Sequence, residues 1–277
     1  MEPALIDRIF LASDMNYLRQ TLALLYNIKA NVTRDVEIVL VLSGVHQDIQ
    51  GRTICFLENL SAQKFKIRPF FLSESEQEDL LSDFIQNPNL RITKTTFLRL
   101  FCSVWLPSNT RSLLYLDSDT LICGNIDELI SYVPKLTVAA TPNPWSVQEI
   151  ESVLGSDFRG RYFNAGVMKI NWTRWGSLNY EKKFKESVKG RDESYIYNDQ
   201  DILNLQLSED WEVLDSMYNF LVNDPKISLF PITKAPKIIH FAGAKPWEET
   251  AVTPFVIKYR NEFWRRLHEI EEALGGH

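Results

Sequence analysis

Apolar runs and segments of helical periodicity alternate along the chain. The run from Val36 to Ser43 is rich in β-branched residues and almost wholly apolar, as is typical of a parallel strand buried on both faces. Residues 16–28 carry apolar side chains at helical spacing and predict a helix. Further strands are predicted at 8–13, 66–71, 113–117, 138–141 and 237–240, and further helices at 49–60, 79–85 and 95–104. Strands separated by helices of this length predict an α/β fold with a mainly parallel central sheet flanked by helices.

The 277 residues suffice for one large domain with a modest extension. The composition changes after Trp247, so we expect a main domain at 1–247 and a C-terminal helical extension at 248–277. Apolar residues recur on the extension three or four positions apart and predict one helix face: Phe255, Tyr259, Phe263, Leu267, Ile270 and Leu274. Basic and aromatic residues beside this face are typical of peripheral membrane contact, and the alternative is a helix packed on the main domain.

The acidic balance of the chain bears on its partners. Thirty basic and 36 acidic side chains give a net charge of −6, which argues against a nucleic-acid binder, because such proteins carry a basic surface. No apolar run reaches the ~18 residues that cross a bilayer, and the first residues do not resemble a signal peptide. Cys55, Cys102 and Cys123 are expected to be reduced packing residues. We therefore expect a cytoplasmic protein, with the membrane contact at the inner face of the membrane.

Several signatures of nucleotide and hydrolase sites are absent from the sequence. No Gly-x-Gly-x-x-Gly follows the first strand, which argues against a classical dinucleotide-binding fold. Residues 155–160 have the spacing of a phosphate loop, but Arg161 and Tyr162 follow where such a loop carries Lys and Ser or Thr. The sequence contains neither Gly-x-Ser-x-Gly nor His-Glu-x-x-His.

Two carboxylates follow the apolar strand at 113–116. Asp117 and Asp119 are two residues apart, so in an extended backbone both project to the same side and can reach one cation. In open α/β sheets, ligands bind at this carboxyl-terminal edge. The alternative is a strand-to-turn junction in which an aspartate caps the turn.

A second apolar strand ends at His240 and is followed by Gly243 and Lys245. Glycine lets the backbone approach a ligand closely, and lysine meets a phosphate as a point charge. Two carboxylates and one imidazole suit Mn²⁺, which accepts oxygen ligands and tolerates nitrogen. The alternative for His240 is a core histidine bonded to backbone.

Six segments carry a resemblance to a known family, and they lie at 12–17, 95–100, 114–121, 162–168, 198–204 and 240–247. With these segments in this order, the chain resembles the retaining glycosyltransferases of family eight over residues 9–247. That family includes bacterial lipopolysaccharide galactosyl- and glucosyltransferases and the self-glucosylating glycogenins. The resemblance implies a GT-A nucleotide-diphospho-sugar transferase fold and a UDP-hexose donor, with Mn²⁺ or Mg²⁺ as cofactor.

The resemblance also assigns roles to individual residues. The expected metal ligands are Asp117, Asp119 and His240. The expected donor contacts are Ala12, Ser13, Asp14, Asn16, Tyr17, Arg99, Asp117, Ser118, Ala165, Gly166, Gly243 and Lys245. The expected catalytic residues, around the donor sugar, are Asn164, Asp199 and Gln200. Without the family, surface pairing or helix packing is the favoured interpretation of Tyr17 and Arg99, and helix capping is that of Asp201.

The acceptor is expected to be a saccharide or a lipid-linked saccharide. Some relatives carry an aspartate shortly after the strand that matches 138–140, and Asn143 is the nearest polar substitute in this chain. The donor sugar therefore stays open between glucose, galactose and a less common hexose. Three other functions remain as alternatives: a self-glucosylating protein primer, a sugar-nucleotide pyrophosphorylase and a non-catalytic carbohydrate- or nucleotide-binding module. A pyrophosphorylase needs a glycine-rich loop after the first strand, and residues 11–16 contain no glycine.

Overall fold

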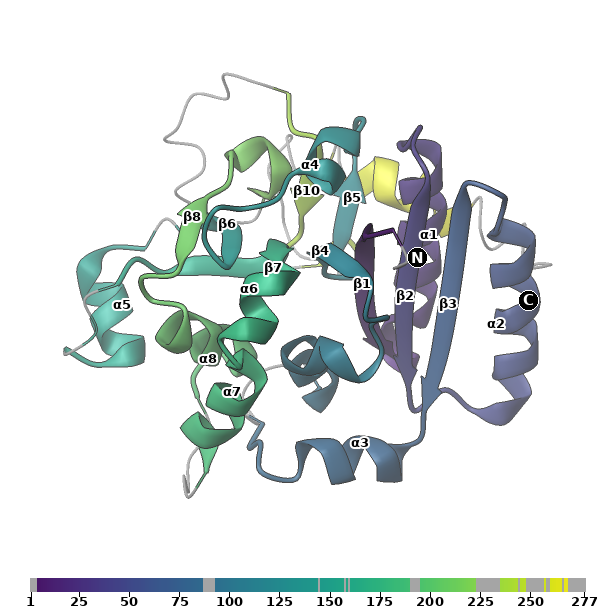
Figure 1. The fold of residues 1–277 in the computed structure, drawn as a ribbon. Helices are drawn as coiled ribbons and strands as arrows, with labels where there is room; N and C mark the ends of the chain where they lie inside the picture. The colour runs from purple at the N-terminus through teal and green to yellow at the C-terminus, as the bar shows by residue number, and fades with distance from the viewer. Residues whose placement is uncertain are drawn as a thin grey trace.

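A seven-stranded sheet forms the centre of the molecule in the computed structural model (Figure 1). The structure describes residues 4–86, 93–143, 145–156, 158, 160–189, 195–222, 235–243, 245–247, 257, 260–265 and 267–268. The order of the strands in the sheet is β3-β2-β1-β4-β7-β6-β8. They are β1 (Ile6–Asp14), β2 (Val36–Ser43), β3 (Phe65–Leu72), β4 (Thr110–Leu116), β6 (Val138–Pro142), β7 (Phe163–Asn171) and β8 (Trp211–Val213). A smaller sheet, of order β5-β10-β9, contains β5 (Thr120–Ile122), β9 (Phe220–Leu221) and β10 (Ile238–His240).

The mainly parallel sheet predicted from the sequence is confirmed. β1 runs parallel to both β2 and β4, β3 runs parallel to β2, and β8 runs parallel to β6. β7, which the apolar pattern did not predict, is antiparallel to its neighbours β4 and β6. Its reversed direction brings the start of β7 beside the end of β4, where Asp117 N donates to Gly166 O at 2.8 Å.

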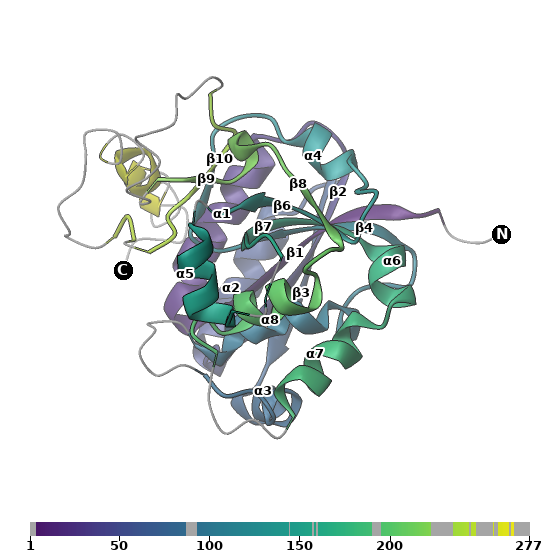
Figure 2. The same cartoon turned by 90° about the vertical axis from the view of Figure 1, so that its left-hand side faces the viewer.

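Helices cover both faces of the sheet, as Figures 1 and 2 show. The α-helices are α1 (Leu18–Ala30), α2 (Gln47–Leu60), α3 (Glu74–Leu81), α4 (Asp127–Ser131), α5 (Val147–Leu154), α6 (Trp172–Ser177), α7 (Tyr180–Val188) and α8 (Asp199–Gln206). The 3₁₀ helices are η1 (Met15–Tyr17), η2 (Lys94–Val104) and η3 (Ser216–Tyr218). Successive side chains of a strand point to opposite faces, so Ile9 and Leu11 lie in the apolar core shared with α1 and α2, while Phe10 lies in the core shared with η2, α7 and α8.

Some local predictions were wrong. The helix expected at 79–85 is α3, which begins at Glu74 because Ser73 and Glu76 form a capping box, and ends at Leu81. The helix expected at 95–104 is the 3₁₀ helix η2, which is kinked at Phe101. Cys102 is buried as expected, but Cys55 and Cys123 are exposed and are not packing residues.

The described residues of the C-terminal segment contribute to the apolar core beside the main sheet. Phe263 and Leu267 are buried in the same cluster as α1 and β10, and the Phe263 ring lies 5.3 Å from that of Trp247. The other residues of the predicted apolar face, Phe255, Tyr259, Ile270 and Leu274, lie outside the described residues. The division at residue 247 stays a prediction. Among the described helices, none is both long and apolar enough to span a bilayer.

A lysine is wholly buried in the sheet, at the end opposite to the carboxyl edge of β4. Lys169 of β7 donates to Ser112 Oγ and to Ile130 O, both at 2.7 Å. Burial lowers its pKa to about 7, although the charge of Asp7 opposes this shift. Unfolded lysine holds its proton up to about pH 10.4, so the unfolded state binds more protons than the folded state between these values.

We therefore expect the free energy of unfolding to gain up to about 1.4 kcal/mol per pH unit from Lys169 as the pH rises above 7. The stability that Lys169 contributes is complete only above its unfolded pKa of about 10.4, and it is lost as the pH falls through its folded pKa of about 7. Urea unfolding of Lys169→Met between pH 7 and 9 should show a shallower pH dependence than that of the parent protein. Lys66→Met, at an exposed lysine of β3, is the control and should leave the slope unchanged.

Candidate active site

A cleft of about 440 Å³ opens at the carboxyl ends of β1 and β4. β1 and β4 are parallel, so the residues that follow them lie at one edge of the sheet, where open α/β sheets bind ligands. The start of β7, the first turn of α8 and the residues after β10 complete the wall. The lining includes Ala12, Ser13, Asp14, Tyr17, Arg99, Asp117, Ser118, Asp119, Asn164, Asp199, Gln200, His240, Gly243 and Lys245.

Asp117, Asp119 and His240 meet at one side of this cleft. Each offers a ligand atom, and these three atoms lie within 4.8 Å of one another. The pairing of β10 with β5 sets His240 opposite Thr120, which brings its ring to Asp119. His240 Nε2 lies 3.3 Å from Asp119 Oδ1 and 3.8 Å from Asp117 Oδ2. The convergence predicted from the i, i+2 spacing and from the end of the second strand is thus confirmed.

The surroundings of this group fit a cation. Asp119 Oδ1 is buried and accepts no hydrogen bond from any described residue. Burial would raise the pKa of Asp119, but the positive charge of Lys245 and the contact with His240 hold it well below its usual range. The carboxylate is therefore ionised, and an ionised oxygen buried without a donor needs a positive partner. Two carboxylates and an imidazole are ligands that Mn²⁺ accepts.

The His240 ring occupies the space that a side chain at position 166 would need. A Cβ added to Gly166 would lie 2.1 Å from His240 Cε1, far inside van der Waals contact. We expect Gly166→Ala to displace the ring, to lower the free energy of unfolding by about 1–3 kcal/mol and to weaken Mn²⁺ binding. Urea unfolding and electron paramagnetic resonance of free Mn²⁺ would measure the two effects.

Gly176 provides the control for this substitution. It lies in α6, where an added Cβ would meet nothing within 4 Å. Gly176→Ala should leave Mn²⁺ binding unchanged and stabilise the helix slightly. Equal Mn²⁺ affinities for Gly166→Ala and the parent protein would contradict the placement of His240.

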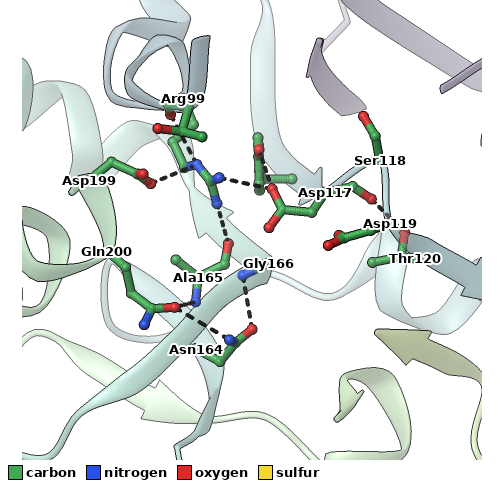
Figure 3. A network of polar contacts seen from close by, with 12 residues as sticks. Arg99, Asp117, Ser118, Asp119, Thr120, Asn164, Ala165, Gly166, Asp199 and Gln200 are labelled. Atoms are coloured by element: carbon green, nitrogen blue, oxygen red, sulfur yellow. Dashed lines mark hydrogen bonds and ion pairs between the residues drawn. The ribbon is translucent and has the colours of Figure 1, made fainter. Parts of the chain in front are cut away.

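Arg99 of η2 joins the two sides of the cleft (Figure 3). Its Nη2 lies 2.9 Å from Asp117 Oδ1, its Nε lies 2.8 Å from Asp199 Oδ2, and its Nη1 donates to Ala165 O at 3.0 Å. Burial alone would lower the pKa of Arg99, but Asp117 and Asp199 raise it, so the guanidinium is always charged. Burial raises the pKa of Asp199 to about 6, and Arg99 opposes this rise. Arg99 is therefore buried in an ion-pair network, not on the surface.

Two amide side chains lie beside each other at the start of β7 and of α8 (Figure 3). Gln200 Oε1 accepts from Asn164 Nδ2 at 3.3 Å and from Ala165 N at 3.0 Å. Asn198, the residue before α8, has φ 50° and ψ −121°. Gln200 N donates to Tyr197 O at 3.1 Å. These values are those of a type II′ turn, whose positive φ is unusual for asparagine. The strained turn carries Asp199 and Gln200 into the cleft.

The opposite wall carries the remaining polar groups. Asp14 caps η1, accepting from Asn16 N at 2.9 Å and from Tyr17 N at 3.2 Å. The Tyr17 ring packs edge-on against Trp247, with centroids 5.6 Å apart. Lys245 Nζ pairs with Asp119 and donates to Phe241 O at 3.2 Å. Gly243 has φ 87°, which explains a glycine there, and its added Cβ would meet nothing within 4 Å.

Three residues of the predicted set do not line the cleft: Asn16, Ala165 and Gly166. Asn16 is exposed, while Ala165 and Gly166 are buried behind the wall.

Other functional candidates were missed. Tyr115 donates to Asp117 Oδ1 at 2.6 Å, and its i, i+2 spacing from Asp117 was a usable signal. Tyr162 begins one of the segments that carry the resemblance, but it was assigned no role. Asn219, Trp145 and Tyr197 carried no signal in the sequence pattern.

Comparison with known proteins gives the following matches. The family described as "Glycosyl transferase family 8" has a sequence model that matches residues 8–251. A lipopolysaccharide 1,2-glucosyltransferase of Escherichia coli is 31% identical over 62% of this chain and 56% of its own length. A lipopolysaccharide 1,3-galactosyltransferase of Salmonella typhimurium is 29% identical over 58% of this chain and 52% of its own. The matched part thus spans about half the length of these relatives.

A solved structure agrees with the fold over nearly the whole chain. The galactosyltransferase LgtC, in complex with donor and acceptor sugar analogues, superposes with a TM-score of 0.75 and 22% identity, covering 95% of each chain. The fold is therefore the GT-A fold that the sequence resemblance implied.

Proposed function

Because the chain belongs to glycosyltransferase family 8, we propose that it transfers glucose or galactose from a UDP-sugar to a hydroxyl group of a glycan or glycolipid acceptor. The observation that carries the proposal is the convergence of Asp117, Asp119 and His240 beside Lys245 in the one cleft. The relatives that are named as glucosyl- and galactosyltransferases support a hexose as the group transferred.

Asp117, Asp119 and His240 would hold a divalent cation, Mn²⁺ or Mg²⁺. Such a cation, when bound, neutralises the negative charge that develops on the leaving diphosphate. Lys245 already lies at this group, and it supplies a second positive charge toward the phosphates from the other side. The protein thereby concentrates positive charge where the bond to the leaving group breaks.

The uridine would lie along the wall formed by β1 and η1. Tyr17 offers an aromatic face, and stacking of a base on such a face contributes about 1–3 kcal/mol. The Asp14 carboxylate can accept from the uracil N–H while it caps η1. Ala12, Ser13, Ser118 and Gly243 complete this part of the cleft.

We propose retention of the α configuration by attack on the same face as departure. An inverting enzyme needs a general base opposite the leaving group, and a double displacement needs a nucleophile beneath the anomeric carbon. Asp199 is paired with Arg99, and the neighbouring amide of Gln200 is a poor nucleophile. Gln200 is instead suited to stabilise positive charge on the sugar, with the UDP phosphate accepting the acceptor proton.

Release of UDP tests the proposal directly. Incubation with UDP-glucose and with UDP-galactose should release UDP slowly without acceptor and faster with a saccharide acceptor. EDTA should abolish the release, and Mn²⁺ should restore it. Full activity in EDTA would contradict the metal assignment, and no release from any UDP-hexose would contradict the donor assignment.

The stereochemical proposal has its own measurement. Proton NMR of the first product should show an α-linked hexose from an α-UDP-hexose, and a β-linked product would overturn it. Gln200→Ala should lower kcat more than it raises the donor KM, because its help comes mainly in the transition state.

A further inference from the structure

A chain of hydrogen bonds connects His240 of β10 with Asp201 of α8, through Asn219, which precedes β9, and through residues at the start of β7. His240 Nδ1 lies 3.1 Å from Asn219 Oδ1, and Asn219 Nδ2 donates to Asn164 Oδ1 at 2.9 Å. Asn164 Nδ2 then donates to Gln200 Oε1. Gln200 Nε2 lies 3.1 Å from the Tyr162 hydroxyl, which donates to Asp201 Oδ1 at 2.5 Å. The chain of hydrogen bonds therefore passes through both His240, a proposed ligand of the cation, and the Gln200 amide, which we place beside the donor sugar.

Two backbone groups fix the direction of this chain. A backbone N–H can only donate, so the side-chain atom facing it must be an acceptor. Gly166 N donates to Asn164 Oδ1 at 3.0 Å, and Ala165 N donates to Gln200 Oε1 at 3.0 Å. These contacts determine which end of each amide carries the oxygen.

The direction then determines the tautomer of His240. Because Asn164 Oδ1 is an acceptor, the Asn219 atom that faces it must be the NH₂ group. The Asn219 oxygen therefore faces His240 Nδ1, and this nitrogen must carry a proton. In the neutral imidazole, the Nε2 lone pair is then left toward Asp117 and Asp119, as ligation of a cation through Nε2 requires.

The other arm of the chain fixes Gln200. Its oxygen is held by two donors at the start of β7, so its NH₂ group points to the Tyr162 hydroxyl. That hydroxyl accepts from Gln200 and must donate onward, to Asp201. Tyr162 and Asp201 are almost wholly buried, and the second Asp201 oxygen accepts from Tyr197 N at 2.8 Å. The capping role expected of Asp201 is therefore wrong, because α8 begins at Asp199 with Asn198 at its N-cap, and the Asp201 carboxylate accepts from Tyr162 and Tyr197 instead.

We propose that Asn219, Tyr162 and Asp201 are positioning residues: Asn219 holds His240 in the Nδ1–H tautomer, and the Tyr162–Asp201 pair holds the amide orientation of Gln200. Asn164 joins the two arms, so one network orients the group that binds the cation and the group beside the sugar. The role of the Gln200 arm rests on the proposed transferase function, whereas the tautomer of His240 does not.

The tautomer can be measured on the unaltered protein. Long-range proton–nitrogen NMR of the metal-free chain at pH 9 reports which imidazole nitrogen is protonated, and the chain has only four histidines. The His240 signals are identified by their loss in His240→Gln. We expect a proton on Nδ1 and a bare Nε2. A proton on Nε2 with a bare Nδ1 would overturn the proposal, whether or not the protein transfers sugar.

Substitutions separate the two arms. Asn219→Leu should release the tautomer and weaken Mn²⁺ binding by about 10- to 100-fold, the usual effect of losing the partner of a ligating histidine. Asn219→Asp keeps an acceptor for Nδ1–H and should keep the tautomer, even if Asn219→Leu does not fold. Asn171→Leu, at a partly buried asparagine at the far end of β7, is the control and should leave Mn²⁺ affinity unchanged.

Tyr162→Phe should leave the tautomer and the Mn²⁺ affinity unchanged, and it should lower kcat by about 10- to 100-fold with little change in the donor KM. Tyr180→Phe is the matched control, because Tyr180 is also buried and donates to a carboxylate, Asp210, away from the cleft. An unchanged kcat for Tyr162→Phe, or equal losses for both phenylalanine variants, would overturn the role of the Tyr162–Asp201 pair.

Discussion

Replacing Asp119 by asparagine is expected to lower kcat/KM for hexosyl transfer by at least about 10²-fold, the loss that follows removal of one preorganised charge-stabilising group. Asparagine keeps the size of the side chain but removes the negative charge, and so weakens the hold of the Asp117–Asp119–His240 group on a cation. It also releases Lys245 from its ion pair. UDP release at a series of Mn²⁺ concentrations would measure the loss.

The fold should survive this substitution, because the core clusters on both faces of the sheet do not include Asp119. Circular dichroism and thermal unfolding would check that the variant is folded. Asp127→Asn is the control: this aspartate accepts from Thr33 N at 3.1 Å, away from the cleft. It should reduce stability without reducing transfer. Equal activity losses in the two variants would contradict a role for Asp119 in the chemistry.

Replacing Arg99 by methionine is expected to lower the free energy of unfolding by about 3–5 kcal/mol, the usual cost of breaking a buried ion pair from one side. The substitution leaves the Asp199 carboxylate, whose side chain is 4% exposed, without its guanidinium partner. Urea unfolding would measure the loss. Arg174→Met is the control, because Arg174 is 42% exposed in its pair with Asp210, and such pairs contribute at most about 1 kcal/mol.

The pH dependence gives a second readout for Arg99. Burial already raises the pKa of Asp199 to about 6, and removal of the guanidinium raises it further. An acid whose folded pKa is raised destabilises the fold as the pH rises through that value. The stability difference between Arg99→Met and the parent protein should therefore be larger at pH 8 than at pH 4.5. The double variant Arg99→Met/Asp199→Asn should recover part of the loss, and strict additivity would contradict the pairing.

The sequence predicted those parts of the site that follow from strand ends. The Asp117 and Asp119 side chains lie together because residues i and i+2 of an extended backbone project to the same side. His240 lies beside them because its apolar strand ends at the same edge of the molecule. The apolar pattern did not predict β7, because Gly166 and Lys169 interrupt the run of apolar residues in this strand. A buried lysine is rare, and here it persists because Ser112 and Ile130 supply its hydrogen bonds.

Other features depend on contacts that a linear pattern does not contain. Asn219 lies between His240 and Asn164 only because β9 pairs with β10. The burial of Arg99 follows from two carboxylates that lie 18 and 100 positions away along the chain. For Asp14, Tyr17 and the other residues assigned through the resemblance, the structure shows where they lie, and their roles stay predictions.

The reversed direction of β7 determines which part of this chain can change in length at little cost. β6 ends and β7 begins at the cleft, and Asn143 N donates to Tyr162 O at 2.9 Å across the neck between them. The two ends of the segment from 143 to 162 are therefore held side by side at the sheet. Doubling the length of such a loop costs only about 0.6 kcal/mol. A change in the length of this segment therefore alters the surface beside the cleft, while Asp117, Asp119 and His240 stay in place.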